Sequence, residues 1–180
     1  MKGILFKPDM IKAIVEGRKT QTRRLMKLNF GFGWEPPQLG IGDATFKHNL
    51  EVMHITGRYQ AGEVVYIKEA WCESYFGEPI CYKLDGNESP GPKGFWRSPM
   101  FLPARAARYF IQITNVRPER LQEITEHDAN LEGIGALSMM QPARMMYQRL
   151  WDSINKQDWN SNPWVWVYSF KLVSKPEGEK

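Results

Sequence analysis

The sequence predicts an α+β domain in which a mainly antiparallel sheet or small barrel has helices at its side. Three segments have the apolar pattern of strands, at 64–69, 108–116 and 162–173. Two helical segments follow one another between the last two strands. A chain with few helices between its strands favours antiparallel pairing, because parallel strands need a crossover connection.

The first helix is expected to run from about Asp9, as its N-cap residue, to Glu16. Four apolar residues form one stripe along it: Met10, Ile11, Ile14 and Val15. Gly17 is expected to end the helix in the left-handed conformation. The segment Arg18–Arg24 alternates threonines with longer polar side chains and is expected to be extended.

The last strand, 162–173, is apolar on both faces, so we expect it to be deeply buried. Its alternating aromatic residues are interpreted as core and not as a platform on which bases stack: Trp164, Trp166, Tyr168 and Phe170.

The two intervening helices have recognisable boundaries. One starts at Thr125, with Asp128 in a capping-box-like arrangement, and stops before Gly133. The other runs from near Pro142 to Ile154. Along it Met146, Leu150 and Ile154 recur every four residues, with Tyr147 and Trp151 on the adjoining row.

A single domain is expected over residues 1–173, with loop-like insertions near 30–62 and 76–103 that are rich in glycine and proline. The second insertion contains a short strand candidate at 80–84. The polar tail 174–180 is expected to be disordered.

The composition indicates a globular protein with a real core, since 42% of the 180 residues are hydrophobic and 13% are aromatic. No stretch approaches the ~20 apolar residues of a membrane helix. The apolar run Ile4–Phe6 is too short for a secretory signal. We therefore expect a cytoplasmic protein without a membrane partner.

The two cysteines, Cys72 and Cys81, are expected to be reduced thiols, with a disulfide as the less favoured alternative. The three histidines, His48, His54 and His127, lack zinc-ligand spacing. We expect no metal and no cofactor.

Positive charge is concentrated in two stretches. Residues 1–30 contain eight lysines and arginines against two acids, and residues 93–120 contain six against one, while the net charge of the chain is +4. Such patches are typical of nucleic-acid binding, but two ordinary solvated faces would give the same pattern.

The segment Gly17–Arg24 is the sharpest feature, because four cations and two hydroxyls follow a helix end. Arg18, Lys19, Arg23 and Arg24 suit phosphates and flat rings, and threonine hydroxyls such as that of Thr22 suit phosphates or base edges. A solvated basic edge that prevents strand pairing is the alternative.

Further binding candidates lie beside the strands at 64–69 and 108–116: Lys68, Glu69, Trp71, Arg105 and Arg108. Trp71 is a candidate for stacking on a base. Glu69 and Glu132 are acids that could orient a lysine or move protons, although such residues are more often solvated.

Several blocks together resemble the ASCH domain family, and in particular its longer phage and prophage members. They occur in the family's order and cover most of the chain: GRKTQTRR, GEVVYIKEAW, PARAARYFIQITNVRPERLQEITEHDANLEGI, LWDSIN and NPWVWVYSFKLV. The resemblance implies a PUA-like fold, a small β-barrel with helices beside it, and a cleft that binds RNA.

One branch of that family hydrolyses the acyl amide of N4-acetylcytidine. Its catalytic lysine, threonine and glutamate correspond to Lys19, Thr22 and Glu132. Thr22 would be the nucleophile, Lys19 its activator and Glu132 a proton relay.

We therefore expect a domain that binds RNA or a modified nucleoside. An amidohydrolase acting on acylated cytidine is the first alternative. A phage accessory protein that binds a host protein through its tryptophan- and proline-rich insertions is the second.

Overall fold

The computed structural model describes residues 1–27, 38–40, 42–48, 51–76, 79–86, 90, 92–134, 141–155 and 158–176. Short 3-10 helices connect several of its elements. The strands and α-helices follow in this order: β1 (Gly3–Leu5), α1 (Pro8–Val15), β2 (Gln21–Leu25), β3 (Gln38–Leu39), β4 (Asp43–His48), β5 (Glu51–Thr56), β6 (Val64–Lys68), β7 (Trp71–Glu73), β8 (Pro79–Tyr82), β9 (Phe110–Arg120), α2 (Glu126–Leu131), α3 (Ala143–Ile154) and β10 (Trp164–Val173).

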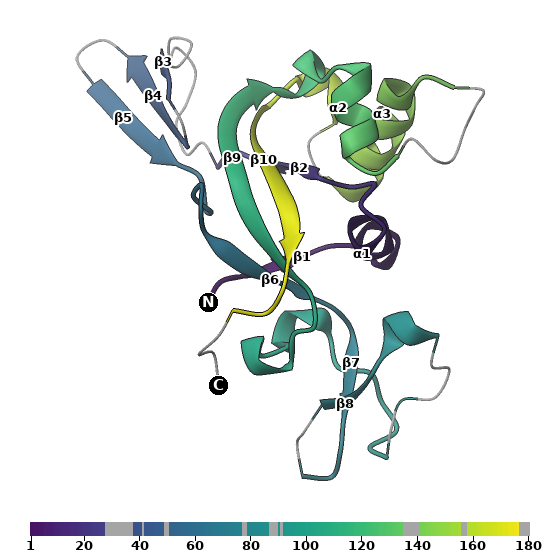
Figure 1. Ribbon diagram of the computed structural model, residues 1–180. Helices are drawn as coiled ribbons and strands as arrows, with labels where there is room; N and C mark the ends of the chain where they lie inside the picture. Colours follow the sequence, from purple (N-terminus) through teal and green to yellow (C-terminus); the bar gives the residue numbers. More distant parts are fainter. Residues whose placement is uncertain are drawn as a thin grey trace. The chain divides into compact units, whose positions relative to one another are not determined.

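The main sheet has the strand order β1-β6-β9-β10-β2 (Figure 1). β1 runs parallel to β6, whereas β6 with β9 and β10 with β2 are antiparallel. Two smaller antiparallel sheets contain β3-β4-β5 and β7-β8. The predicted α+β fold with a mostly antiparallel sheet is confirmed, but the pairings of the described residues do not close the sheet into a barrel.

The chain forms two compact units. Unit 1 comprises Met1–Glu16, Val64–Gln112 and Leu172–Lys180, and unit 2 comprises Gly17–Glu63 and Ile113–Lys171. The strands β9 and β10 each contribute residues to both units. The expected single domain over residues 1–173, with its insertions, stays a prediction.

Each unit has its own buried core. The unit 1 core contains the fully buried Phe110 of β9, together with Tyr66, Trp71, Leu102, Ala106 and Ala107. In the unit 2 core, residues of α2 and α3 pack against residues of the strands, and the two helices lie side by side (Figure 1). It consists of Leu121, Ile124, Ala129, Ile134, Tyr147, Trp151, Trp159, Val165 and Val167.

The first helix starts earlier than expected. Its N-cap is Lys7 and not Asp9, because Pro8 occupies the first helical turn, where its fixed φ fits and its missing N–H costs nothing. Asp9 lies in that turn, where a carboxylate favours the helix dipole. Gly17 adopts a φ of 75°, as expected of a residue that follows a helix end.

The two later helices match their prediction closely. The Thr125 hydroxyl accepts a hydrogen bond from the Asp128 N–H at 3.0 Å, which confirms Thr125 as the cap of α2. In α3 the fully buried row is Tyr147 and Trp151, whereas Ile154 is 44% exposed. Burial of the larger aromatic rings removes more apolar surface from water, which explains why the aromatic row faces the core.

The last strand is core, as predicted. Trp166, Tyr168 and Phe170 are each at most 4% exposed, and only Trp164 is partly accessible. β9 extends to Arg120, four residues beyond the predicted end at Val116. Pro118 lies within this strand. A proline lacks the backbone N–H donor, but its fixed φ is compatible with extended backbone.

Composition did not indicate the strand pair β4 and β5, which lies within the first predicted insertion and has the register Asp43↔Thr56 to His48↔Glu51. Much of the glycine- and proline-rich segment 30–43 lies outside the described residues, as do residues 177–180 of the predicted tail. No helix among the described residues is long and apolar enough to cross a membrane.

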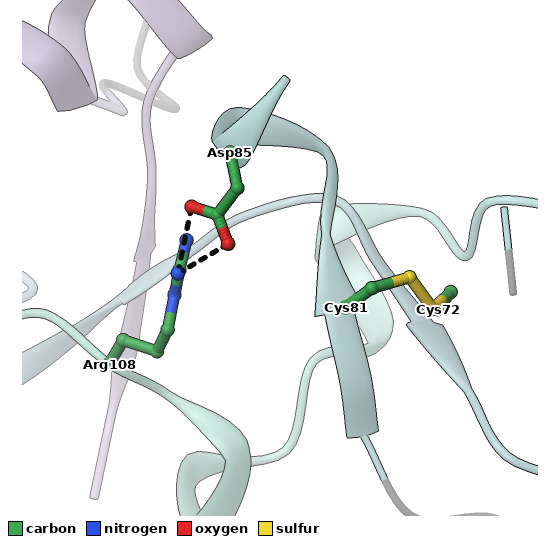
Figure 2. The surroundings of a disulfide bond; sticks show 4 residues. All are labelled: Cys72, Cys81, Asp85 and Arg108. Atoms are coloured by element: carbon green, nitrogen blue, oxygen red, sulfur yellow. Dashed lines mark hydrogen bonds and ion pairs between the residues drawn. A yellow bond between two sulfur atoms is a disulfide. The ribbon is translucent and has the colours of Figure 1, made fainter. Parts of the chain in front are cut away.

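A disulfide joins Cys72 and Cys81, so the prediction of two reduced thiols is wrong (Figure 2). The two residues are register partners in the antiparallel β7–β8 pair, and their Cα atoms are 5.2 Å apart. This separation lies within the range that a disulfide spans. Sequence spacing alone could not reveal that the strand pair would place them opposite each other.

Candidate functional site

Backbone hydrogen bonds join the segment after Gly17 to the end of α2. The N–H of Thr20 donates to the carbonyl of Leu131 at 2.8 Å. Lys19 and Glu132, the C-cap residue of α2, form an isolated antiparallel bridge. Residues 113 positions apart in the sequence therefore lie side by side in unit 2.

Lys19 is almost fully buried, with 1% of its surface exposed. Its Nζ donates to the Oε2 of Glu132 at 2.6 Å, to the carbonyl of Glu132 at 2.9 Å and to the carbonyl of Gln21 at 2.8 Å. Burial lowers the pKa of Lys19, and the neighbouring Glu132 carboxylate opposes this shift only partly. Lys19 therefore releases its proton more readily than an exposed lysine.

Arg23 connects the same glutamate to two further acids. Its NH1 donates to the Oε1 of Glu132 at 3.1 Å, and its Nε and NH2 donate to the Oε1 of Glu119 at 3.1 and 2.9 Å. The Oδ2 of Asp128 lies 3.5 Å from NH2. Burial alone would lower the pKa of Arg23, but the carboxylates of Glu132 and Glu119 raise it.

These five residues form a buried charge cluster: Lys19, Arg23, Glu119, Asp128 and Glu132. Arg117, which is 37% exposed, also contacts Glu119 at 3.1 Å and Asp128 at 3.7 Å, so three cations face the three carboxylates. Lys19 and Arg23 are at most 4% exposed. The basic motif therefore does not present these side chains as a solvated patch. Interactions in such a desolvated site are stronger than at the surface.

Residues of β2 point alternately to its two faces, so Gln21 and Arg23 share one face while Thr22 and Arg24 share the other. Thr22 is 5% exposed and lies opposite Tyr168 of β10. Burial lowers the pKa of Arg24. Lys19 and Glu132 are in contact, whereas the alternation turns Thr22 away from the face of Arg23.

One buried acceptor of β2 has no hydrogen-bond partner within the part of the chain that the structure describes. It is the Oε1 of Gln21, whose residue is 8% exposed. The backbone carbonyl of Gln21 accepts from Lys19. Because buried polar atoms are nearly always paired, a donor group of a ligand, such as an amine or a hydroxyl, suits this position.

The sequence did not identify three residues that contact Arg23 in and beside the buried charge cluster: Glu119, Asp128 and Tyr147. The Arg23 guanidinium carbon lies 6.0 Å from the centre of the Tyr147 ring, and burial raises the pKa of Tyr147 well above its usual value. The only signal was the excess of acids near the start of α2, which suits a basic motif elsewhere.

Two predicted binding residues of unit 1, Glu69 and Arg108, form an ion pair with each other. The Nε and NH2 of Arg108 donate to the Oε1 and Oε2 of Glu69 at 3.0 and 2.7 Å. The NH1 of Arg108 donates to Asp85 at 2.9 Å, as Figure 2 shows. The guanidinium also stacks on Tyr82, 3.8 Å from the ring centre. Burial alone would lower the pKa of Arg108, but hydrogen bonds to the two carboxylates raise it.

The other predicted binding residues have diverse environments. Lys68 donates to the carbonyl of Met100 at 2.7 Å. Trp71 is 4% exposed and lies in the unit 1 core, so it offers no open ring face to a base. Arg105 is exposed, and so is Arg18, whose NH1 donates to the carbonyl of Gly133 at 3.4 Å.

The candidates thus separate between the two units. Unit 2 contains Arg18, Lys19, Thr22, Arg23, Arg24 and Glu132, and unit 1 contains Lys68, Glu69, Trp71, Arg105 and Arg108. Among the described residues, no three His, Cys, Asp or Glu side chains lie together in a group that could hold a metal ion.

Neither a family model nor a curated protein matches the sequence. A structure of a protein from Enterococcus faecalis V583, described by the family model DUF984, is similar, with 12% identity, a TM-score of 0.45 and coverage of 100% of this chain and 86% of that one. An ASCH domain from Lactobacillus crispatus JV V101 is also similar, with 16% identity, a TM-score of 0.40 and coverage of 97% and 80%.

Proposed function

We propose that the chain binds RNA or a modified nucleoside, and that it reads a single base or ribose at the buried charge cluster of unit 2. The observation that carries the proposal is the environment of Lys19, whose ammonium is buried against Glu132 with a lowered pKa. Buried, strongly perturbed ionisable groups are concentrated at functional sites.

The pairing of charges favours recognition of a base over tracking of a phosphate backbone. A backbone-binding surface needs exposed cations, but Lys19 and Arg23 are both buried and paired with carboxylates. The neighbouring Oε1 of Gln21, a buried acceptor, suits an amino or hydroxyl group of a nucleoside.

Calorimetric titration with cytidine, N4-acetylcytidine and a short single-stranded RNA tests this proposal. Gln21→Met removes the acceptor while keeping a side chain of similar size, and it should weaken nucleoside binding about tenfold, the loss of one hydrogen bond. Gln148→Met is the matched control on α3, outside the cluster, and should bind as the wild type does.

The salt dependence distinguishes the two modes of RNA binding. Base reading at the buried charge cluster, whose cations are paired with carboxylates, predicts an affinity that changes little between low and high salt. A slope of log affinity against log salt of about −0.7 for each of several contacts would indicate backbone binding instead. Absence of binding by all three ligands would contradict the proposal.

Hydrolysis of an acylated cytidine is the second candidate, favoured by the 2.6 Å contact between Lys19 and Glu132 and the lowered pKa of Lys19. In this reaction the Thr22 hydroxyl would attack the acyl carbon and pass its proton to a neutral Lys19. Glu132 would relay a proton to the leaving cytidine amine, and water would then release the acyl group from Thr22. The orientation of Thr22 on β2 places this candidate second.

Incubation with N4-acetylcytidine, followed by chromatography for cytidine, tests the reaction. Thr22→Val removes the nucleophile without disturbing the buried charges, so it should abolish turnover while nucleoside binding persists. Full turnover in that variant would eliminate Thr22 as nucleophile. Binding without turnover in the wild type would leave a binding domain.

A further inference from the structure

A tight backbone contact in unit 1 places Trp71 of β7 next to Arg97. The N–H of Arg97 donates to the carbonyl of Trp71 at 2.8 Å, and the N–H of Trp71 donates back at 3.4 Å. In such an antiparallel pair the two side chains lie on the same face. The Arg97 guanidinium carbon is 5.8 Å from the centre of the Trp71 ring.

Both side chains carry a buried N–H donor that has no acceptor among the residues the structure describes. These donors are the Nε1 of Trp71 and the Nε of Arg97. Trp71 is 4% exposed, so its indole nitrogen is shielded from bulk water. Two unsatisfied buried donors on neighbouring side chains are unusual in a folded protein, and an oxygen acceptor supplied by a ligand would satisfy each of them.

The rest of the Arg97 side chain is held in place. Glu73, two residues after Trp71 on β7, accepts from the NH2 of Arg97 and, at 2.8 Å, from the Nζ of Lys93. The Phe95 ring centre lies 5.5 Å from the guanidinium carbon. These contacts leave the Nε edge of the guanidinium for another acceptor.

The local charge favours an anion as that acceptor. Lys93 and Arg97 together carry two positive charges against the single carboxylate of Glu73. Their side chains are 27% and 36% exposed, so a ligand can approach from the solvent side. A tetrahedral oxyanion has several oxygens and can accept from two separate donors at once.

We infer that Trp71 and Arg97 of unit 1, with Lys93 beside them, form a binding site for a phosphate group. The phosphate belongs either to a free nucleotide or to an RNA backbone. Recognition uses the indole N–H and the guanidinium Nε–H as a pair of fixed donors. The inference is independent of nucleoside binding in unit 2, because it uses none of the same residues.

The indole N–H signals of the protein labelled with 15N-tryptophan provide the readout, and Trp71→Phe identifies the Trp71 signal by its loss. Titration with inorganic phosphate should shift this signal saturably, whereas potassium chloride of equal ionic strength should not. Trp96→Phe changes the tryptophan next to Arg97 in the chain and should leave the phosphate response intact. Arg97→Lys keeps the charge but removes Nε, and it should weaken binding about tenfold.

The two sources of phosphate are separated by comparing 5′-cytidine monophosphate with a short single-stranded RNA. Tighter binding of RNA assigns the site to a backbone phosphate, and equal or tighter binding of the nucleotide assigns it to a free one. A Trp71 signal that does not respond to phosphate, or that responds equally to chloride, overturns the inference. A response to RNA alone overturns it too, because the donors would then not read a phosphate group.

Discussion

Replacing Glu132 by glutamine tests whether the buried charge cluster is held by mutual neutralisation. Glu132 is 4% exposed, and its two carboxylate oxygens accept from Lys19 at 2.6 Å and from Arg23 at 3.1 Å. Glutamine preserves the shape but removes the negative charge. The glutamine side chain also places an NH2 donor next to either Lys19 or Arg23, both of which are donors that need an acceptor.

The expected cost follows from the state of the partners that remain. Removing one member of a buried ion pair costs about 3–5 kcal/mol, because it leaves an uncompensated buried charge. Arg23 retains Glu119 and Asp128, so only Lys19 loses its counter-charge entirely. We therefore expect the lower end, about 3 kcal/mol of unfolding free energy, or roughly a hundredfold in the folding equilibrium.

Urea unfolding followed by circular dichroism near neutral pH measures this loss. Glu126→Gln is the control, since Glu126 is an exposed acid of α2 and glutamine keeps an oxygen that can accept from the Arg144 N–H, as Glu126 does at 3.1 Å. It should change the unfolding free energy by less than about 1 kcal/mol. The double variant Lys19→Met/Glu132→Gln should recover part of the loss, because it no longer buries a lone ammonium. A loss below about 1 kcal/mol for Glu132→Gln alone would refute the reasoning.

Three further predictions concern other features. Because burial lowers the pKa of Lys19 below its usual 10.5, the unfolded chain binds more protons than the folded one in the window below 10.5. The stability of the wild type relative to Lys19→Met should therefore increase with pH in that window, as urea titrations at several pH values would reveal. Reduction of the Cys72–Cys81 disulfide, whose cysteines are nine positions apart, should cost about 2–3 kcal/mol by the chain-entropy relation. The variant with alanine at both positions should not respond to reductant. Gly17→Ala should cost about 1 kcal/mol in thermal or urea unfolding, since Gly17 has a φ of 75° and a Cβ there would meet nothing within 4 Å.

Local patterns predicted most of the elements, because helix caps and strand periodicity depend on neighbouring residues alone. Thr125 caps α2 as expected, and the stripe of β10 is buried as expected. The same reasoning failed where a distant partner decides the outcome. Cys72 and Cys81 become partners through the register of β7 and β8, which their spacing does not reveal.

The candidate site in unit 2 was likewise predictable only in part. The basic motif and the family resemblance selected Lys19 and Glu132, and the structure brings them into contact. The sequence did not predict Glu119 and Asp128 as members of the site, because only the fold brings their carboxylates next to Arg23. Those carboxylates change the motif from an apparent basic surface into a neutralised interior cluster, and a one-dimensional charge count cannot distinguish the two.

The division of β10 between the units has a consequence for synthesis on the ribosome. Unit 2 needs residues of β10 up to Lys171, and unit 1 needs the residues that follow. Neither unit can complete its core until this strand has left the exit tunnel, although the early segments emerge long before. The edges of β2 and β9 that pair with β10 are exposed to other chains during that interval, so slower translation would lengthen the period in which nascent chains can aggregate.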